Sequence, residues 1–162
     1  MIFKASLDKT AIGITIFIAA LFACIIGIVY AIYASKGALY PVYSFAIILL
    51  MIYCLAFAFH PTAYKITGDE LIIYRPIWNV RIKRTAIKSI AIVDKNEING
   101  AVRTFGVGGV FGYYGCFANY TLGSMTWYAT RKDTAVLITT TNNKKIVVTP
   151  DEPEQFVAAF NG

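Results

Sequence analysis

The side chains that most often carry out acid–base or nucleophilic catalysis are scarce in this sequence. Histidine occurs once, as His60, at the end of a long apolar run, where an amphipathic end position accounts for it. The 9 acidic residues fall mostly in predicted turns or near the start of the last predicted helix, and no pair is placed for general acid–base work. We therefore expect no enzymatic activity.

Two further patterns could indicate a cofactor or a metal, and neither does. The three cysteines, Cys24, Cys54 and Cys116, form no CxxC-type pair, so neither a metal site nor a disulfide framework is predicted. The glycine-rich segment 106–115 lacks the Gly-Lys-Ser/Thr ending of a phosphate-binding loop and does not lie between a predicted strand and a predicted helix. We expect no cofactor, and we interpret 106–115 as a flexible loop.

Aromatic and basic side chains are the better candidates for a binding surface. The loop 106–115 carries Phe111, Tyr113 and Tyr114, which either fold back onto the domain or contact a membrane or a partner. The basic candidates are Lys65, Arg81, Lys83, Arg84 and Lys88. Three interpretations of these basic residues stay open: a solvated face, a surface attracted to anionic lipid, or a pocket for a lipid headgroup. They match no nucleic-acid-binding motif, so we expect no nucleic-acid partner.

The elements that must position these candidates begin with two membrane spans. Hydrophobic residues make up 57% of the 162 residues and charged residues only 15%. Residues 11–34 and 38–59 contain no charge. The first run would form a helix of roughly 36 Å, enough to cross a hydrocarbon core of about 30 Å. A cleaved signal peptide has a shorter apolar core, so a transmembrane hairpin is predicted.

The basic residues that flank the two spans predict their orientation. Lys4 and Lys9 precede the first span, Lys36 alone lies in the connecting loop, and six basic residues follow the second span by position 88. The positive-inside rule then places both termini in the cytoplasm and the short loop outside. We expect a multi-pass protein of the cytoplasmic (inner) membrane.

Small residues recur every four positions along the first span and include Ala19, Ala23, Gly27 and Ala31. Small side chains at this spacing let helix backbones approach closely in lipid. Two interpretations stay open: this stripe packs against the second span, or it joins two copies of the chain.

The remaining residues show a β pattern followed by one helix. Apolar runs at 64–67 and 71–74 flank a turn at 68–70, residues 79–84 alternate apolar and polar, and further strands are predicted at 87–93, 125–130, 135–140 and 145–148. Thr149 and Pro150 then resemble an N-cap and a first helical residue, and Phe156, Val157 and Phe160 lie on one helical face. Six or seven antiparallel strands closed by one helix are predicted.

This order of elements resembles a pleckstrin-homology (PH) domain, a small antiparallel β-barrel or sandwich capped by its C-terminal helix. Residues 67–73, 103–106, 111–115, 128–130 and 147–150 are similar to bacterial membrane proteins with two N-terminal spans and a PH-like domain. We therefore expect a membrane α + β protein: a cytoplasmic segment at 1–10, a transmembrane helical hairpin at 11–61 and a cytoplasmic PH-like domain at 62–162.

The resemblance implies a fold and a location but no settled activity. We expect an integral membrane interaction module that binds a protein partner or associates with itself at the cytoplasmic face. The alternative is a sensor of anionic lipid or lipid headgroups. The first turn at 68–70 contains Asp69 and Glu70, which departs from the basic first hairpin of phosphoinositide-binding PH domains.

Overall fold

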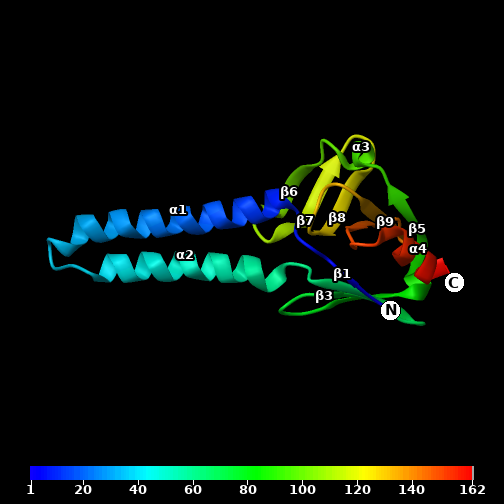
Figure 1. Ribbon diagram of the computed structural model, residues 1–162, viewed down its shortest axis with the longest axis horizontal. Helices are drawn as coiled ribbons and strands as arrows, with labels where there is room; N and C mark the ends of the chain where they lie inside the picture. The colour runs from blue at the N-terminus through cyan, green and yellow to red at the C-terminus, as the bar shows by residue number, and fades with distance from the viewer. Residues whose placement is uncertain (162) are drawn as a thin grey trace.

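Two long helices lie side by side and project from a β-rich domain in the computed structural model, which describes residues 1–161 (Figure 1). Helix α1 spans Lys9–Ala34 and α2 spans Tyr40–Phe59, so both expected apolar helices are present. The Asp8 side chain caps α1 by accepting a hydrogen bond from the Ala11 amide at 2.6 Å. Both helices are long and apolar enough to cross a membrane.

The first sheet joins the start of the chain to the segment that follows the helices. It contains β1 (Ile2–Lys4), β2 (Ala63–Ile66), β3 (Glu70–Tyr74) and β4 (Val80–Lys83), in that order, with every pair antiparallel. Because β1 pairs with β2, the two ends of the helical hairpin emerge from neighbouring strands. The sequence pattern gave no indication of β1.

The second sheet has six strands in the order β5-β9-β10-β8-β7-β6. Their bounds are Ile87–Val93 (β5), Val102–Gly109 (β6), Gly112–Asn119 (β7), Gly123–Ala129 (β8), Ala135–Thr140 (β9) and Lys145–Val148 (β10). Short helices, η1 (Arg84–Ala86) and α3 (Lys95–Ile98), precede and follow β5. Strand β10 pairs antiparallel with β9, as expected, but parallel with β8. The predicted number of six or seven strands was too low, and the parallel pairing of β10 with β8 departs from the predicted antiparallel arrangement.

The glycine-rich segment is a β-hairpin, not the flexible loop that the sequence predicted. Strands β6 and β7 run through it, and only Val110 and Phe111 lie between them. Gly106 and Gly115 face each other across the hairpin with φ of 111° and 122°. A Cβ atom on either residue would collide with the backbone of the opposite strand. These glycines therefore permit a close approach of two strands.

The C-terminal helix also begins later than the sequence predicted. Helix α4 spans Pro153–Asn161, so neither Thr149 nor Pro150 starts it. The Thr149 hydroxyl instead accepts a hydrogen bond from the Thr130 amide at 2.9 Å. This bond joins the ends of the neighbouring strands β10 and β8. Phe156 and Phe160 on α4 are buried, as expected.

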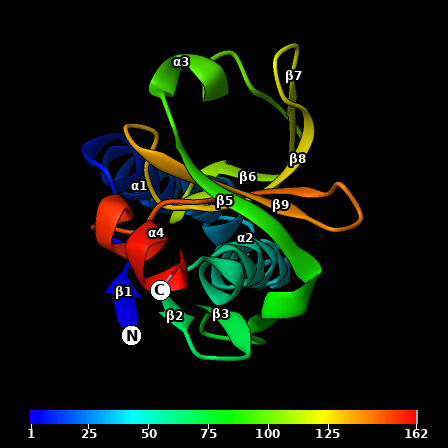
Figure 2. The same ribbon diagram turned by 90° about the vertical axis from the view of Figure 1, so that its right-hand side faces the viewer.

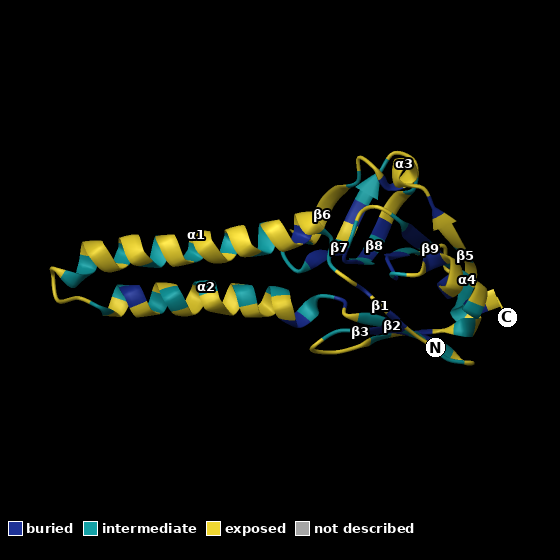
Figure 3. Ribbon diagram, viewed as in Figure 1, coloured by how far each residue is buried: buried dark blue, intermediate teal, exposed yellow. Residues whose placement is uncertain are grey.

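One of the two hydrophobic cores forms where α4 meets both sheets, and the other forms around Phe117 and Trp127. In the end-on view of Figure 2, α4 lies between the first sheet and strands of the second. Phe156 packs edge-on against Phe3 of β1, with ring centroids 5.2 Å apart, and one buried cluster contains both rings together with Tyr64, Ile138 and Val148. The two sheets form a sandwich-like layer pair that does not close into a barrel. Figure 3 shows that burial is concentrated in this domain, whereas α1 and α2 are mostly exposed.

Candidate functional site

The turn of the β6–β7 hairpin docks against the bases of both long helices. The Phe111 amide donates a hydrogen bond to Thr15 Oγ1 on α1 at 2.9 Å. The Phe111 ring lies 5.0 Å from the Tyr53 ring and 5.3 Å from the Phe57 ring, both on α2. These contacts fix the orientation of the domain relative to the helical hairpin.

Gly109 brings the same hairpin close to α1. A Cβ atom placed on Gly109 would lie 2.6 Å from Cδ1 of Ile14, and its φ is 127°. The backbone conformation therefore favours glycine here, and an added methyl group would also force the Ile14 side chain to shift. We call the set Ile14, Thr15, Tyr53, Phe57, Gly109 and Phe111 the hairpin–helix junction.

Tyr113 and Tyr114, the other aromatic candidates, are buried by the chain itself. The Tyr114 hydroxyl donates a hydrogen bond to the carbonyl of Ala56 on α2, and burial raises its pKa. Burial, with a contribution from the Asp8 carboxylate, raises the pKa of Tyr113 to about 12, and the Lys132 Nζ lies 4.4 Å from its ring centroid. Neither ring is exposed to a partner or a lipid in this structure.

The five basic candidates do not form one cluster. The strand register places Lys65, Ile72 and Arg81 next to one another across the first sheet, and Lys83 lies opposite Glu70. Arg81 forms an ion pair with Glu70 at 3.4 Å, which offsets part of the positive charge on this face.

The last two basic candidates lie away from that face. Lys88 is on β5, in the other sheet. The Arg84 guanidinium donates to the Phe160 carbonyl and lies over the Phe160 ring, with Cζ 4.5 Å from the centroid. Arg84 therefore holds α4 in place, which is a structural role.

The small residues of α1 face mainly outward. Ala19 and Ala23 border a shallow groove at the seam between α1 and α2, where the Phe22 and Tyr53 rings approach to 6.4 Å. Gly27 and Ala31 are exposed, and a Cβ atom on Gly27 would meet nothing within 4 Å. Larger side chains therefore make much of the contact between the helices, and the stripe leaves an uncovered apolar face.

Sequence reasoning did not single out a group of exposed apolar side chains around the end of α2. Trp78 and Phe105 are 76% and 78% exposed, and Ile77 is also exposed. The Ile77 amide donates to the Ala58 carbonyl at 3.0 Å, which fastens the β3–β4 turn to α2. Bulky apolar residues in the turn after Pro76 were the available signal, because such turns are usually polar.

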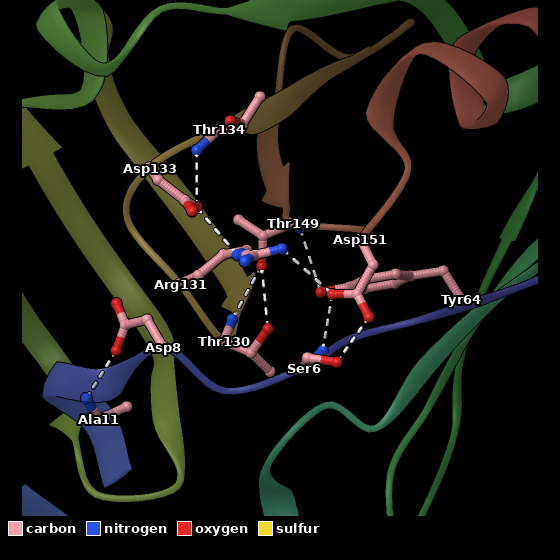
Figure 4. Close-up of polar contacts among 10 residues, drawn as sticks. All are labelled: Ser6, Asp8, Ala11, Tyr64, Thr130, Arg131, Asp133, Thr134, Thr149 and Asp151. Atoms are coloured by element: carbon pink, nitrogen blue, oxygen red, sulfur yellow. Dashed lines mark hydrogen bonds and ion pairs between the residues drawn. The ribbon is translucent and has the colours of Figure 1, made fainter. Parts of the chain in front are cut away.

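A polar network fixes β1 to the rest of the domain (Figure 4). The Asp151 carboxylate accepts hydrogen bonds from the Ser6 amide at 3.0 Å and the Ser6 hydroxyl at 2.6 Å, and it forms an ion pair with Arg131 at 3.2 Å. Asp151 therefore connects the segment that follows β1 to the segment that precedes α4.

Tyr64 lies at the centre of the domain beside this network. Its hydroxyl donates to the Tyr128 carbonyl at 2.6 Å and accepts from the Thr149 amide at 3.2 Å. Burial raises its pKa to about 12. Within residues 1–161, no three side chains of the metal-ligating types His, Cys, Asp and Glu gather in one place.

Comparison with protein families identifies the domain. The model of the bacterial PH domain matches residues 62–162. The chain belongs to the bacterial PH domain family. Comparisons with curated proteins and with solved structures give no match. In this bacterial PH domain protein, the matched region covers β2 to α4, while β1 and the two long helices precede it. The family supports a role as an interaction module.

Proposed function

We propose that this protein is a membrane-anchored, non-catalytic bacterial PH domain module that binds a protein partner at the cytoplasmic membrane face. The observation that carries the proposal is the free edge of β6, the last strand of the six-stranded sheet. Val102 on this strand is 68% exposed and Phe105 is 78% exposed. An edge with unpaired backbone groups and exposed apolar side chains can accept a strand from a partner.

The shape of the β6 edge restricts which strands can pair with it. A β-bulge lies between Arg103 and Phe105 and increases the local twist. A partner strand must match that twist, which disfavours indiscriminate edge-to-edge pairing. The same edge from a second copy could also pair around a two-fold axis, so self-association is the second form of this proposal.

Membrane anchoring is supported by the surface of the two helices. In the 18-residue apolar stretch of each helix, only 6% of α1 and 11% of α2 is buried by the rest of the chain. Apolar helices this exposed are stable when lipid covers them. The β1–β2 pairing supports placing both chain ends on one side of the bilayer, and the basic flanks favour the cytoplasmic side. Residues 11–61 then form the anchor, and 62–162 together with β1 form the module.

A sensor of anionic lipid remains the alternative function. Lys65, Arg81 and Lys83 share one face of the first sheet, which supports attraction to an anionic surface. The ion pair between Arg81 and Glu70 weakens that attraction. Binding by this face should decrease steeply with salt, whereas pairing along β6 should not.

Photo-crosslinking in the native membrane tests the proposed edge. A photoreactive amino acid replaces Val102 on β6 in the full chain, and a matched control replaces the exposed Ile92 on β5, the strand at the opposite edge of the same sheet. We expect a protein adduct from position 102 and none from position 92. An adduct of twice the chain mass would indicate self-association. Equal adducts from both positions, or none from 102, would contradict the proposal.

A further inference from the structure

An apolar groove of about 600 Å³ lies between the last turns of α2 and the face of β6, β7 and β8. Its walls include Ile52, Leu55 and Phe59 of α2, Phe105 of β6 and Tyr128 of β8. This volume is in the range of ligand-binding clefts in proteins. The groove is separate from the outward backbone edge of β6 and from the basic face of the first sheet.

Arg75 is the one charged residue in the groove lining. Its guanidinium carbon lies 5.5 Å from the centroid of the Phe59 ring and 5.7 Å from that of Tyr128. Its Nε donates to the Trp78 carbonyl at 2.8 Å. Within residues 1–161, no carboxylate lies within ion-pair distance of Arg75. A half-buried guanidinium without a counter-ion is suited to bind an anion, above all a phosphate.

The groove is continuous with the surface of α2 that we propose to face lipid. Leu55 and Ile52 line it and are also about half exposed. From Phe59 back to Ile52 the helix rises about 10 Å, so an aliphatic chain can lie along this wall while its polar end stays near Arg75. The exposed Trp78 and Phe105 lie at this level too, where aromatic side chains suit the boundary between headgroups and hydrocarbon.

We infer that this groove binds one glycerophospholipid, with its phosphodiester on Arg75 and one acyl chain along Leu55 and Ile52. Charge complementarity and continuity with the helix surface favour this occupant over an apolar peptide, which has no phosphate for the guanidinium. The inference rests on the membrane insertion proposed above, because only insertion brings the groove to the bilayer surface. The bound lipid would then fill the space between the domain and its anchor.

The test uses the full chain in detergent and phosphatidylglycerol as the probe, because its headgroup has no cation to compete with Arg75 for the phosphate. Native mass spectrometry measures the one-lipid adduct. We expect Arg75→Gln to weaken binding about tenfold, in line with loss of a charge-assisted contact. The matched control is Lys144→Gln in the turn between β9 and β10, which removes an exposed positive charge outside both the groove and the basic face and should bind as the wild type does.

A second measurement does not depend on changing Arg75. Cys116 lines the groove and is exposed in the structure. In a variant with Cys24 and Cys54 replaced by alanine, phosphatidylglycerol should slow maleimide labelling of Cys116 at least threefold. Unchanged labelling with lipid present, or equal binding by R75Q and the wild type, would overturn the lipid site. If the two helices lie in the membrane, that result contradicts the lipid site and leaves the proposed membrane-anchored module intact. If the helices lie outside the membrane, both the lipid site and the membrane-anchored module are contradicted.

Discussion

Replacing Gly109 with alanine is expected to loosen the β6–β7 hairpin from α1. The added methyl group would start 2.6 Å from Cδ1 of Ile14, and the φ of 127° is one that residues with a side chain rarely adopt. Overpacking of this kind costs about 1–3 kcal/mol, and backbone strain costs about 1–3 kcal/mol. We therefore expect the free energy of unfolding to fall by about 2–4 kcal/mol, allowing for partial relaxation.

The assay is thermal unfolding of the full chain in detergent. For a chain of this size, about 2–4 kcal/mol corresponds to a decrease in Tm of about 4–16 °C. Gly108→Ala is the matched control, because its Cβ atom would meet only the Arg103 side chain at ordinary contact distance, 3.5 Å. That variant should change Tm little.

A double-mutant cycle separates the two causes. Ile14→Ala removes Cδ1 and Cγ2, the two atoms that the new methyl group approaches most closely, so Gly109→Ala should cost about 1–2 kcal/mol less in the Ile14→Ala background. The remaining cost is the backbone strain. A Gly109→Ala variant as stable as the wild type, or a cost that Ile14→Ala leaves unchanged, would refute the close contact between the hairpin and α1.

Three further predictions concern the polar groups in the domain. Tyr64→Phe should destabilise the fold by about 1–3 kcal/mol in denaturant unfolding, because the two backbone groups that its hydroxyl bridges lose their partner; the exposed Tyr120→Phe should have no effect. Stability should also fall between pH 10 and 12, because burial raises the pKa of Tyr64 and Tyr113 to about 12 from 10. The stability that these two buried, protonated phenols contribute is fully present below their pKa in the unfolded chain and is lost as pH rises through their pKa in the folded chain. When unfolding is measured across this pH range, the free energy of unfolding of Tyr64→Phe should therefore decline less steeply than that of the wild type. Asp151→Asn should lower stability by about 1 kcal/mol in thermal unfolding by weakening the contacts with β1, whereas the exposed Glu154→Gln should not.

Features set by local sequence were predicted well. The two apolar helices follow from uninterrupted apolar runs, and β9 at 135–140 and β10 at 145–148 match the predicted bounds because a turn with Asn142 and Asn143 separates them. The alternation along 79–84 predicted a strand with an apolar and a polar face, and in β4 Ile82 is buried while Arg81 is exposed. In each case the signal lies within a few neighbouring residues.

Features set by distant partners were missed. The three residues of β1 are too few to give a pattern, and their strand conformation depends on pairing with β2, about sixty residues away. The glycines of β6 and β7 have low strand propensity, and only the opposite strand and α1 explain them. The same holds for the groove, since Arg75, Phe59 and Tyr128 come together only when the sheets and α2 pack.

The central claim is that the helical hairpin holds the domain at the cytoplasmic face, and sidedness of labelling tests it most directly. In a chain with its three cysteines replaced by serine, single cysteines are placed at Ser35, in the loop between the helices, and at Lys144, in the exposed turn between β9 and β10. An impermeant maleimide should label position 35 only in right-side-out vesicles and position 144 only in inside-out vesicles. Labelling of both positions from the same side would contradict the claim.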